Sequence, residues 1–283
     1  GLVPFQHRYP ERFFDVGIAE EHAVTFAGGL SAGGLKPVVA IYSTFMQRAV
    51  DQVIHDVALQ NLRCVFALDR SGAVPDDGET HQGLYDIALF RPVPGVSIVC
   101  PASASEMSLL LSWSLRQDHA VFVRYPKAAC PTELPAFSLP VEVGRGVFAH
   151  RDGSDTLIVC TGGIFAEVLE ASNMLARSGS PADSYVLRFV KPIDEDYFID
   201  AVSDYRSVVL VEDGMRSGGV AEYLEFLIRD RSPDVRTSVM AFEPLFYPQG
   251  KRNEILRSAG LSPAHIVDEV RRLRELTASR FTR

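Results

Sequence analysis

The sequence predicts an α/β fold built as two domains. Three observations support this: short β-branched runs alternate with helical patterns, the runs are apolar throughout, and a proline-rich strip interrupts the alternation once. Strands that are apolar along their whole length are typical of parallel sheets covered on both faces. We therefore expect an α/β domain over residues 1–126, a linker over 127–141 and a second, smaller α/β domain over 142–283.

The first domain is expected to contain four strands with helices between them. A helix is predicted to begin at Glu20, because apolar side chains follow it at the spacing of one helical face. The strands are predicted over Lys36–Tyr42, Arg63–Asp69, Val96–Val99 and Ala120–Arg124. Ser103 and Glu106 form a capping box that predicts the start of the helix after the third strand.

The same alternation restarts after the linker. Strands are predicted over Thr156–Cys160, Ser184–Arg188, Ser207–Val211 and Arg236–Ala241. Helices are predicted over Ile164–Arg177 and Gly219–Arg229, and a last one starts at Ser262-Pro263, an N-cap followed by proline in the first helical position.

Composition and charge exclude several classes of protein. Of the 283 residues, 47% are hydrophobic and 23% are charged, which is ordinary for a globular chain. The net charge is −8 and the chain has no block of Lys or Arg, so neither nucleic acid nor an anionic membrane is expected as the main partner. No apolar run approaches the ~20 residues of a membrane span.

The four cysteines are predicted to be free thiols. Cys64, Cys100, Cys130 and Cys160 are widely spaced and form no Cys-x-x-Cys pair. Cys100 and Cys160 end β-like runs and are expected to be buried as small apolar side chains. This pattern predicts a reducing, cytoplasmic compartment. The seven histidines show no zinc-binding spacing, so no metal site is predicted within this chain.

Polar and aromatic side chains gather where the predicted strands end, which is where ligands bind in open α/β sheets. They are Glu20, Tyr42, Phe45, Arg48, Arg70, His81 and Arg124. The long loop from Asp69 to Gly83 also starts there, and ordered loops of this length tend to be functional. Aromatic faces with arginines suit a flat heteroaromatic ring and a phosphorylated substrate.

Each of these residues also has a structural interpretation. Glu20 can complement a helix dipole, Phe45 can belong to the core, and His81 can cap a turn. Arg70 and Arg124 can pair with carboxylates nearby. It is the convergence of the whole set at one edge of the sheet that favours a site.

Five segments resemble the 1-deoxy-D-xylulose-5-phosphate synthase family, thiamine-diphosphate enzymes of the transketolase superfamily. They are Asp15–Glu20, Ala40–Phe45, Asp51–Ala58, Thr80–Gly83 and Val123–Pro126. The resemblance extends over essentially the whole chain and includes Phe189–Asp194 in the second domain. It implies a parallel-sheet pyrimidine-binding domain followed by a transketolase C-terminal-like domain.

The resemblance also implies roles for individual residues. The catalytic residues would be Glu20, Asp77 and His81. The cofactor-binding residues would be Glu20, Phe45 and Arg48. The substrate-binding residues would be Tyr42, Arg70 and Arg124, with the two arginines on the substrate phosphate. Glu20 would hydrogen-bond the N1′ nitrogen of the cofactor's aminopyrimidine, and the cofactor supplies the carbanion chemistry.

The implied reaction condenses pyruvate with glyceraldehyde 3-phosphate to give 1-deoxy-D-xylulose 5-phosphate and carbon dioxide, a precursor of isoprenoids and thiamine. A homodimer is expected from the family. Members hold Mg²⁺ and the diphosphate with a Gly-Asp-Gly motif and a later Asn, which this sequence lacks. Asp76–Gly78 and Glu212–Gly214 are the nearest matches. The Mg²⁺ ligands are therefore expected in a missing N-terminal, diphosphate-binding domain.

Some positions depart from the family pattern and leave alternatives open. Glu21 stands where Gln is usual, and Pro75-Asp76 and Glu79 replace the usual loop residues, which affects acceptor specificity. One hypothesis, prompted by a start at Gly1 without Met, is a fragment of the synthase that is inactive alone. A second is a separate chain, like a β subunit of 2-oxo-acid dehydrogenases or a split transketolase, that needs a partner chain. A third is a structural or binding protein in which the motif residues only pack.

Overall fold

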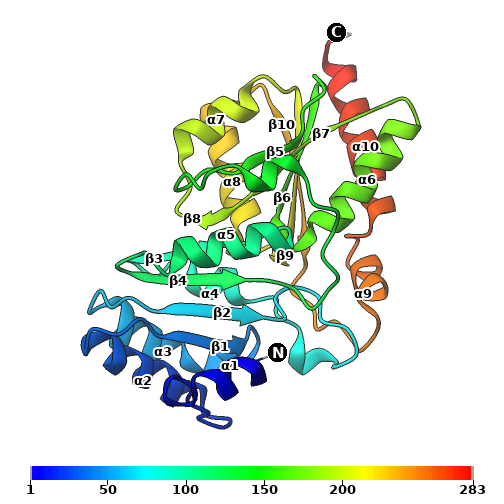
Figure 1. The fold of residues 1–283 in the computed structure, drawn as a ribbon. Coiled ribbons are helices and arrows are strands. Elements are labelled where there is room, and N and C mark those ends of the chain that lie inside the picture. The colour runs from blue at the N-terminus through cyan, green and yellow to red at the C-terminus, as the bar shows by residue number, and fades with distance from the viewer. Residues whose placement is uncertain (1, 282–283) are drawn as a thin grey trace.

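The chain forms two five-stranded sheets (Figure 1). The candidate site lies where strands of the first sheet end. The computed structural model describes residues 2–281. In spatial order, this sheet contains β1 (Val38–Tyr42), β2 (Val65–Asp69), β4 (Ala120–Arg124), β3 (Val96–Val99) and β8 (Phe189–Lys191). The first four are parallel, and β8 is antiparallel to β3. Tyr42 aligns with Asp69, and Leu68 with Arg124, so these strands end at one edge.

Helices and short turns cover the first sheet. They are α2 (Glu20–Ala32), α3 (Val50–Gln52), a π-helix (Val53–Ala58), α4 (Asp86–Phe90) and α5 (Ala104–Ser114). The preceding helix α1 (Val3–Arg8) has no buried residue. The predicted capping box is present, since the Ser103 hydroxyl accepts the Glu106 N–H at 3.3 Å. On one face Phe122 stacks between Phe66 and Phe90, and on the other Trp113 of α5 packs against Phe189.

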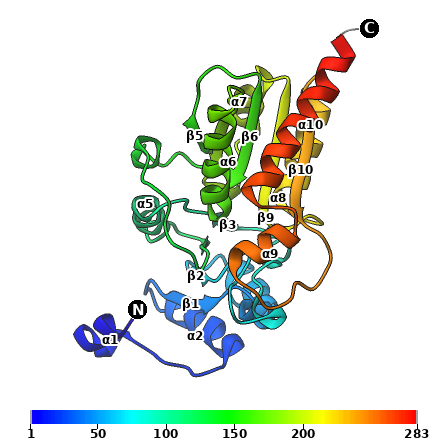
Figure 2. The same cartoon turned by 90° about the vertical axis from the view of Figure 1, so that its right-hand side faces the viewer.

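The second sheet is sandwiched between helices. In spatial order it contains β10 (Arg236–Phe242), β9 (Ser207–Met215), β6 (Thr156–Thr161), β7 (Asp183–Leu187) and β5 (Val147–His150). Its helices are α6 (Phe165–Arg177), α7 (Glu195–Ser203), α8 (Val220–Arg231), α9 (Arg252–Ser258) and α10 (Pro263–Phe281). Figure 1 shows α6 and α10 on one side of the sheet and α7 and α8 on the other. In Figure 2, α1 projects away from the body of the molecule.

The two domains share a continuous core. One hydrophobic cluster contains Phe66 and Phe122 of the first sheet together with Leu157 and Val208 of the second. The chain also crosses back, because β8 follows β7 of the second domain directly and pairs with the first sheet. The two units therefore cannot separate without breaking a sheet and exposing apolar side chains.

Buried Arg188 fastens the proline-rich linker. Its Nε donates to Glu106 Oε1 at 2.6 Å. Its two terminal nitrogens donate to four backbone carbonyls between residues 136 and 140. One guanidinium thus provides hydrogen-bond donors for four carbonyls of a segment that lies outside both sheets, and it orders this segment, which has no hydrophobic periodicity.

The predicted class of two α/β domains is confirmed, with three differences in detail. The second sheet has as many strands as the first, so the second domain is not smaller by that measure. Each sheet carries one antiparallel edge strand, β8 or β5, that the sequence did not reveal. The first strand lies at an edge of its sheet, and Val38 is 49% exposed, so this strand is not covered on both faces as expected.

The cysteines are free, as predicted: Cys64, Cys100 and Cys160 are buried and Cys130 is exposed. Burial raises the pKa of the Cys64 thiol to about 12 and that of Cys100 above its ordinary value, so neither is a reactive thiolate at neutral pH. None of the helices in the described part of the chain is both long enough and apolar enough to cross a bilayer.

Candidate active site

Aromatic rings and cations contact one another at the ends of β1 and β2. We call the cluster of Tyr42, Phe45, Arg70 and His81 the ledge. The rings of Tyr42 and Phe45 stack with centroids 5.6 Å apart. The Arg70 guanidinium carbon lies 3.7 Å from the centre of the Tyr42 ring, and the His81 ring meets the edge of Phe45 at 5.2 Å. Arg70 has φ of +60°, a left-handed conformation that turns the chain sharply as β2 ends. Partly buried aromatic faces and nearby cations suit a flat, electron-rich ring.

Glu20 lies at the start of α2 beside this ledge. It is only 7% exposed, and Arg48 Nη1 donates to its Oε2 at 3.3 Å. The Arg48 guanidinium carbon is 5.8 Å from the centre of the Phe45 ring, which connects the carboxylate to the aromatic pair. A carboxylate in the first turn of a helix also interacts favourably with the unpaired N–H groups there.

Local packing fixes the position of α2. Gly17 has φ of +66°, and its N–H donates to Asp15 Oδ1 at 2.9 Å, which turns the chain just before the helix. On the far side of α2, the Thr25 hydroxyl donates to Asp56 Oδ2 at 2.5 Å. A Cβ at Gly28 would lie 3.0 Å from the Asp56 carbonyl oxygen, a tight contact, so glycine at this position favours the close approach of α2 to the π-helix.

The long loop after β2 reaches back over the ledge. Thr44 Oγ1 donates to the Thr80 carbonyl at 2.9 Å, which brings His81 against Phe45. Asp77 is exposed, and its Oδ2 lies 3.2 Å from Lys127 Nζ. The structure therefore brings Glu20, Tyr42, Phe45, Arg48, Arg70 and His81 into one run of contacts, with Asp77 on the same loop as His81.

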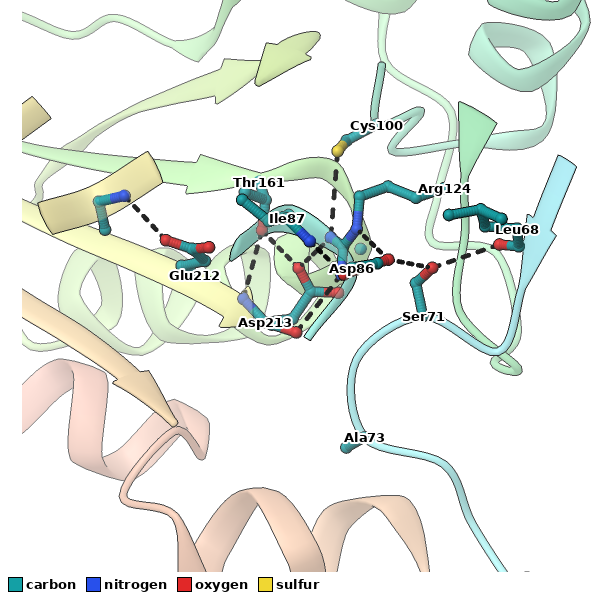
Figure 3. Close-up of polar contacts among 12 residues, drawn as sticks. Leu68, Ser71, Ala73, Asp86, Ile87, Cys100, Arg124, Thr161, Glu212 and Asp213 are labelled. Atoms are coloured by element: carbon teal, nitrogen blue, oxygen red, sulfur yellow. Dashed lines mark hydrogen bonds and ion pairs between the residues drawn. The ribbon is translucent and has the colours of Figure 1, made fainter. Parts of the chain in front are cut away.

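Arg124 is placed differently from these residues and makes the contacts expected of its structural interpretation, a pairing with carboxylates. Its side chain is 1% exposed and lies between the two domains (Figure 3). Nε and Nη2 donate to Asp86 at 3.0 and 3.3 Å, and Nη1 donates to Asp213 Oδ1 at 2.7 Å. Contacts to Cys100 Sγ and the Asp213 carbonyl occupy the remaining N–H groups. A guanidinium with all five donors engaged has none to offer a substrate phosphate.

The acids of this interface carry different charges although they are neighbours in sequence. Burial opposes ionisation of Asp213, but Arg124 and Thr161 hold its pKa below the ordinary value. Burial raises the pKa of Glu212 to about 7, although the Ala221 N–H, which donates to its Oε2 at 2.8 Å, and the charge of Arg124 both act to lower it. Burial also opposes the charge of Arg124, yet the carboxylates of Asp213 and Asp86 raise its pKa well above the usual value.

The sequence analysis missed four polar residues around the site: Asp86, Lys127, Gln249 and Arg252. Asp86 and Lys127 contact predicted residues directly, while Gln249 and Arg252 donate to the loop after β2. Lys127 follows the Arg124-Tyr125-Pro126 motif by one residue, so its position was available as a signal. Within residues 2–281, no three His, Cys, Asp or Glu side chains gather as a metal ion would require.

Comparison with known proteins identifies both halves of the chain. A family profile described as "Transketolase, pyrimidine binding domain" matches residues 1–132, and one described as "Transketolase, C-terminal domain" matches residues 146–266. The chain belongs to the transketolase family. Within that family, it is 61% identical over 267 residues to the 1-deoxy-D-xylulose-5-phosphate synthase of Treponema pallidum strain Nichols, covering 94% of this chain and 42% of the relative. It is 40% identical to 1-deoxy-D-xylulose-5-phosphate synthase 1 of Geobacter sulfurreducens, with the same two coverages.

This transketolase-family chain thus spans less than half the length of those curated relatives. Among solved structures, it is similar to one described as "Split gene transketolase, inactive beta4 tetramer", with TM-score 0.86 and 25% identity over 96% of this chain and 88% of the other. The transketolase of Campylobacter jejuni shares the fold, with TM-score 0.74 and 17% identity over 91% of this chain and 39% of that one.

Proposed function

We propose that this chain supplies the pyrimidine-binding half of a thiamine-diphosphate site for 1-deoxy-D-xylulose-5-phosphate synthesis, in which pyruvate and glyceraldehyde 3-phosphate condense with loss of carbon dioxide. The observation that carries the proposal is the buried carboxylate of Glu20 beside the stacked pair of Tyr42 and Phe45. The 61% identity to a synthase of that name supports the choice of this reaction within the family.

The residues fit the ring of the cofactor by their chemistry. A carboxylate at 7% exposure can hold a proton on a ring nitrogen, and the face of Phe45 can stack on the ring. When bound, thiamine diphosphate supplies the carbanion chemistry of the reaction. Glu20 then accepts a hydrogen bond from the ring and holds the proton there, while Arg48, 3.3 Å away, stabilises the carboxylate in its charged form.

The substrate-facing roles fall to other residues of the ledge. Tyr42 would offer its hydroxyl and Arg70 its guanidinium, which also pairs with Asp69 Oδ2 at 2.5 Å, and Asp77 and His81 come from the loop after β2. Because Arg124 is saturated inside the domain interface, we assign the second phosphate-binding cation to Lys127, whose side chain is 37% exposed beside Asp77. His81 is the group suited to moving a proton at the acceptor carbonyl, since an imidazole ring can both accept and donate a proton.

The proposal includes a diphosphate-binding half from outside this chain. The chain covers 42% of its synthase relatives, and the matched profiles are the pyrimidine-binding and C-terminal ones. Magnesium, with its ligands in that other half, belongs to the same proposal. A cytoplasmic location agrees with the free cysteines. A homodimer agrees with the exposed side chains of Phe14 and Ile18 just before Glu20.

The alternative function is that of a separate chain that a partner chain completes. Its specific support is the likeness to a split-gene transketolase structure, of which this chain covers 88%. The same site would then act in a transketolase or 2-oxo-acid dehydrogenase reaction. The two functions differ in the donor or in the acceptor that the completed enzyme uses.

A single substitution tests the role of Glu20. The chain is combined with the diphosphate-binding half of the Treponema pallidum relative, and formation of 1-deoxy-D-xylulose 5-phosphate is measured. Glu20→Gln removes the charge but keeps the shape, and we expect product formation to fall by about 100-fold or more, as for loss of an acid–base group. Glu21→Gln is the matched control, because Glu21 is the next residue and is exposed.

The outcomes separate the parts of the proposal. Equal activity of Glu20→Gln and Glu21→Gln would show that Glu20 is not the proton-holding carboxylate. If the wild-type assembly uses a sugar-phosphate donor or a lipoyl acceptor and makes no 1-deoxy-D-xylulose 5-phosphate, the alternative function holds and the synthase assignment is wrong.

A further inference from the structure

The loop after β2 belongs structurally to both domains. Its base is closed by paired backbone hydrogen bonds between Gly72 and Gly83, at 2.7 and 3.0 Å. Next to this base, Ala73 and Leu84 are buried in a hydrophobic cluster of the second domain that also contains Tyr247. The stem of the loop is therefore anchored in the C-terminal domain, although the loop leaves from a strand of the first.

The tip of the loop is held by the segment between β10 and α9. The Asp76 N–H donates to the Gly250 carbonyl at 3.0 Å, and Gln249 Nε2 donates to the Asp76 carbonyl at 2.8 Å. Asp76 has φ of +73°, a conformation that costs free energy for a residue with a side chain. The two hydrogen bonds stabilise the peptide groups on either side of this turn.

Arg252 makes the second attachment. Its Nη1 donates to the Ala73 carbonyl at 3.0 Å, and its Nη2 donates to the Gly163 carbonyl at 2.9 Å. Its Nε donates to Glu167 Oε1 at 3.2 Å, which fixes the guanidinium on α6. Because Arg252 is the first residue of α9, the loop is connected through one planar group to two helices of the second domain.

The opposite side of the loop faces the candidate active site. Thr80 accepts a hydrogen bond from Thr44 at 2.9 Å, the His81 ring lies 5.2 Å from that of Phe45, and Asp77 pairs with Lys127 at 3.2 Å. If the hydrogen bonds that hold the tip are lost and the tip shifts, Asp77 and His81 move relative to Tyr42 and Phe45.

From this geometry we infer that Gln249 and Arg252 are positioning residues: the C-terminal domain sets the placement of Asp77 and His81, and with it the fit of the phosphorylated aldehyde acceptor. The inference rests on the proposed function for the identity of the acceptor. Glu20 begins α2 and Phe45 follows β1, so the first domain holds their backbones, and of the two only Phe45 contacts this loop, through the ring of His81. Loss of either attachment therefore affects acceptor binding and leaves the donor side of the site intact.

Hydrogen exchange of the 283-residue chain tests the attachment without any activity. Gln249→Ala removes one hydrogen bond to the loop, and Gln249→Glu places a carboxylate against the Asp76 carbonyl. We expect amides in residues 76–81 to exchange about threefold to tenfold faster in the alanine variant and faster still in the glutamate variant. Gln117→Ala is the matched control, because Gln117 Nε2 also donates to a backbone carbonyl, that of Trp113 at 2.8 Å.

Kinetics of the chain completed with a diphosphate-binding half test the consequence. Gln249→Ala and Arg252→Lys should raise KM for glyceraldehyde 3-phosphate about fivefold to tenfold and leave KM for pyruvate unchanged, whereas Gln117→Ala should change neither. Unchanged loop exchange in both Gln249 variants, or faster exchange with an unchanged acceptor KM, would overturn the inference. If the wild-type assembly makes no 1-deoxy-D-xylulose 5-phosphate, the proposed function fails instead, and the exchange data still decide the attachment.

Discussion

Replacing Arg124 by methionine tests whether the interface between the domains depends on a buried ion network. The substitution introduces an apolar side chain of similar length and leaves Asp86 and Asp213 without the cation that pairs with them. Asp213 is 0% exposed and Asp86 is 3% exposed, so water cannot replace the guanidinium. Removing one partner of a buried ion pair costs about 3–5 kcal/mol, because the remaining charge stays desolvated.

Other donors limit the loss. The Thr161 hydroxyl donates to Asp213 at 2.6 Å, and the Ser71 hydroxyl donates to Asp86 at 2.9 Å. We therefore expect Arg124→Met to lower the free energy of unfolding by about 3–5 kcal/mol in total and not by that amount for each carboxylate. This is a large part of the ~5–15 kcal/mol by which a typical protein is stable.

The assay is urea unfolding at neutral pH, followed by circular dichroism and by the fluorescence of Trp113, the single tryptophan of the chain. Arg231→Met is the matched control: Arg231 pairs with Asp196 at the same 2.7 Å distance, but at the surface, where salt bridges contribute little. The control should unfold at the wild-type urea concentration within experimental error.

A rescue variant separates charge from packing. Adding Asp86→Asn and Asp213→Asn to Arg124→Met removes the buried charges, and we expect at least half of the lost stability to return, since neutral buried groups of similar shape are tolerated better than unpaired ions. A loss below about 1 kcal/mol for Arg124→Met, or a triple variant no more stable than the single one, would refute the network as we describe it.

Three further predictions concern other buried positions. Burial raises the pKa of Glu212 from 4.5 to about 7, so the stability contributed by its neutral form is present below pH 4.5 and is lost as pH rises through about 7. The wild-type chain should therefore lose about 3 kcal/mol of unfolding free energy over this pH range. Glu212→Gln should abolish this loss, measured by urea unfolding at pH 5 and pH 8. Gly163→Ala would place a Cβ 2.2 Å from Asp213 Oδ2 and should cost about 1–3 kcal/mol in the same assay, whereas Gly29→Ala, with nothing within 4 Å, should not destabilise the chain. Native chain should react with Ellman's reagent at exposed Cys130 alone; labelling of a second thiol before unfolding would contradict the burial of the others.

The sequence predicted those elements whose formation depends on local pattern. The β-branched run Val96–Val99 is a strand with the predicted bounds, and Ser103 caps the helix after it. β8 was missed because three residues give no periodicity, and its pairing partner β3 lies in the other domain. α7 was also missed, although it has a local signal: the Asp194 side chain acts as an N-cap and accepts the Tyr197 N–H at 3.1 Å.

For the candidate site, the sequence predicted which residues lie at one edge of the sheet but not which way each side chain points. Tyr42 and Arg70 follow neighbouring parallel strands, and they do stack. Arg124 also ends a strand at that edge, yet its side chain enters the interface, where its partners Asp86 and Asp213 are 38 and 89 residues away in sequence. The contacts with Asp86 of the first domain and Asp213 of the second determine that choice, and no local pattern encodes them.

Glu212 and Asp213, in the last part of β9, link this interface to the candidate site. Asp213 meets Arg124 and stays ionised, whereas Glu212 beside it is buried among N–H donors with a pKa raised to about 7. Asp213 also leaves no room for a side chain opposite it, because a Cβ at Gly72 would lie 2.7 Å from its Oδ2. Gly72 closes the base of the loop that carries two of the candidate catalytic residues. The residue that neutralises the buried guanidinium thus also fixes where that loop begins, so a change of charge at Arg124 should alter hydrogen exchange in the loop as well as the stability of the chain.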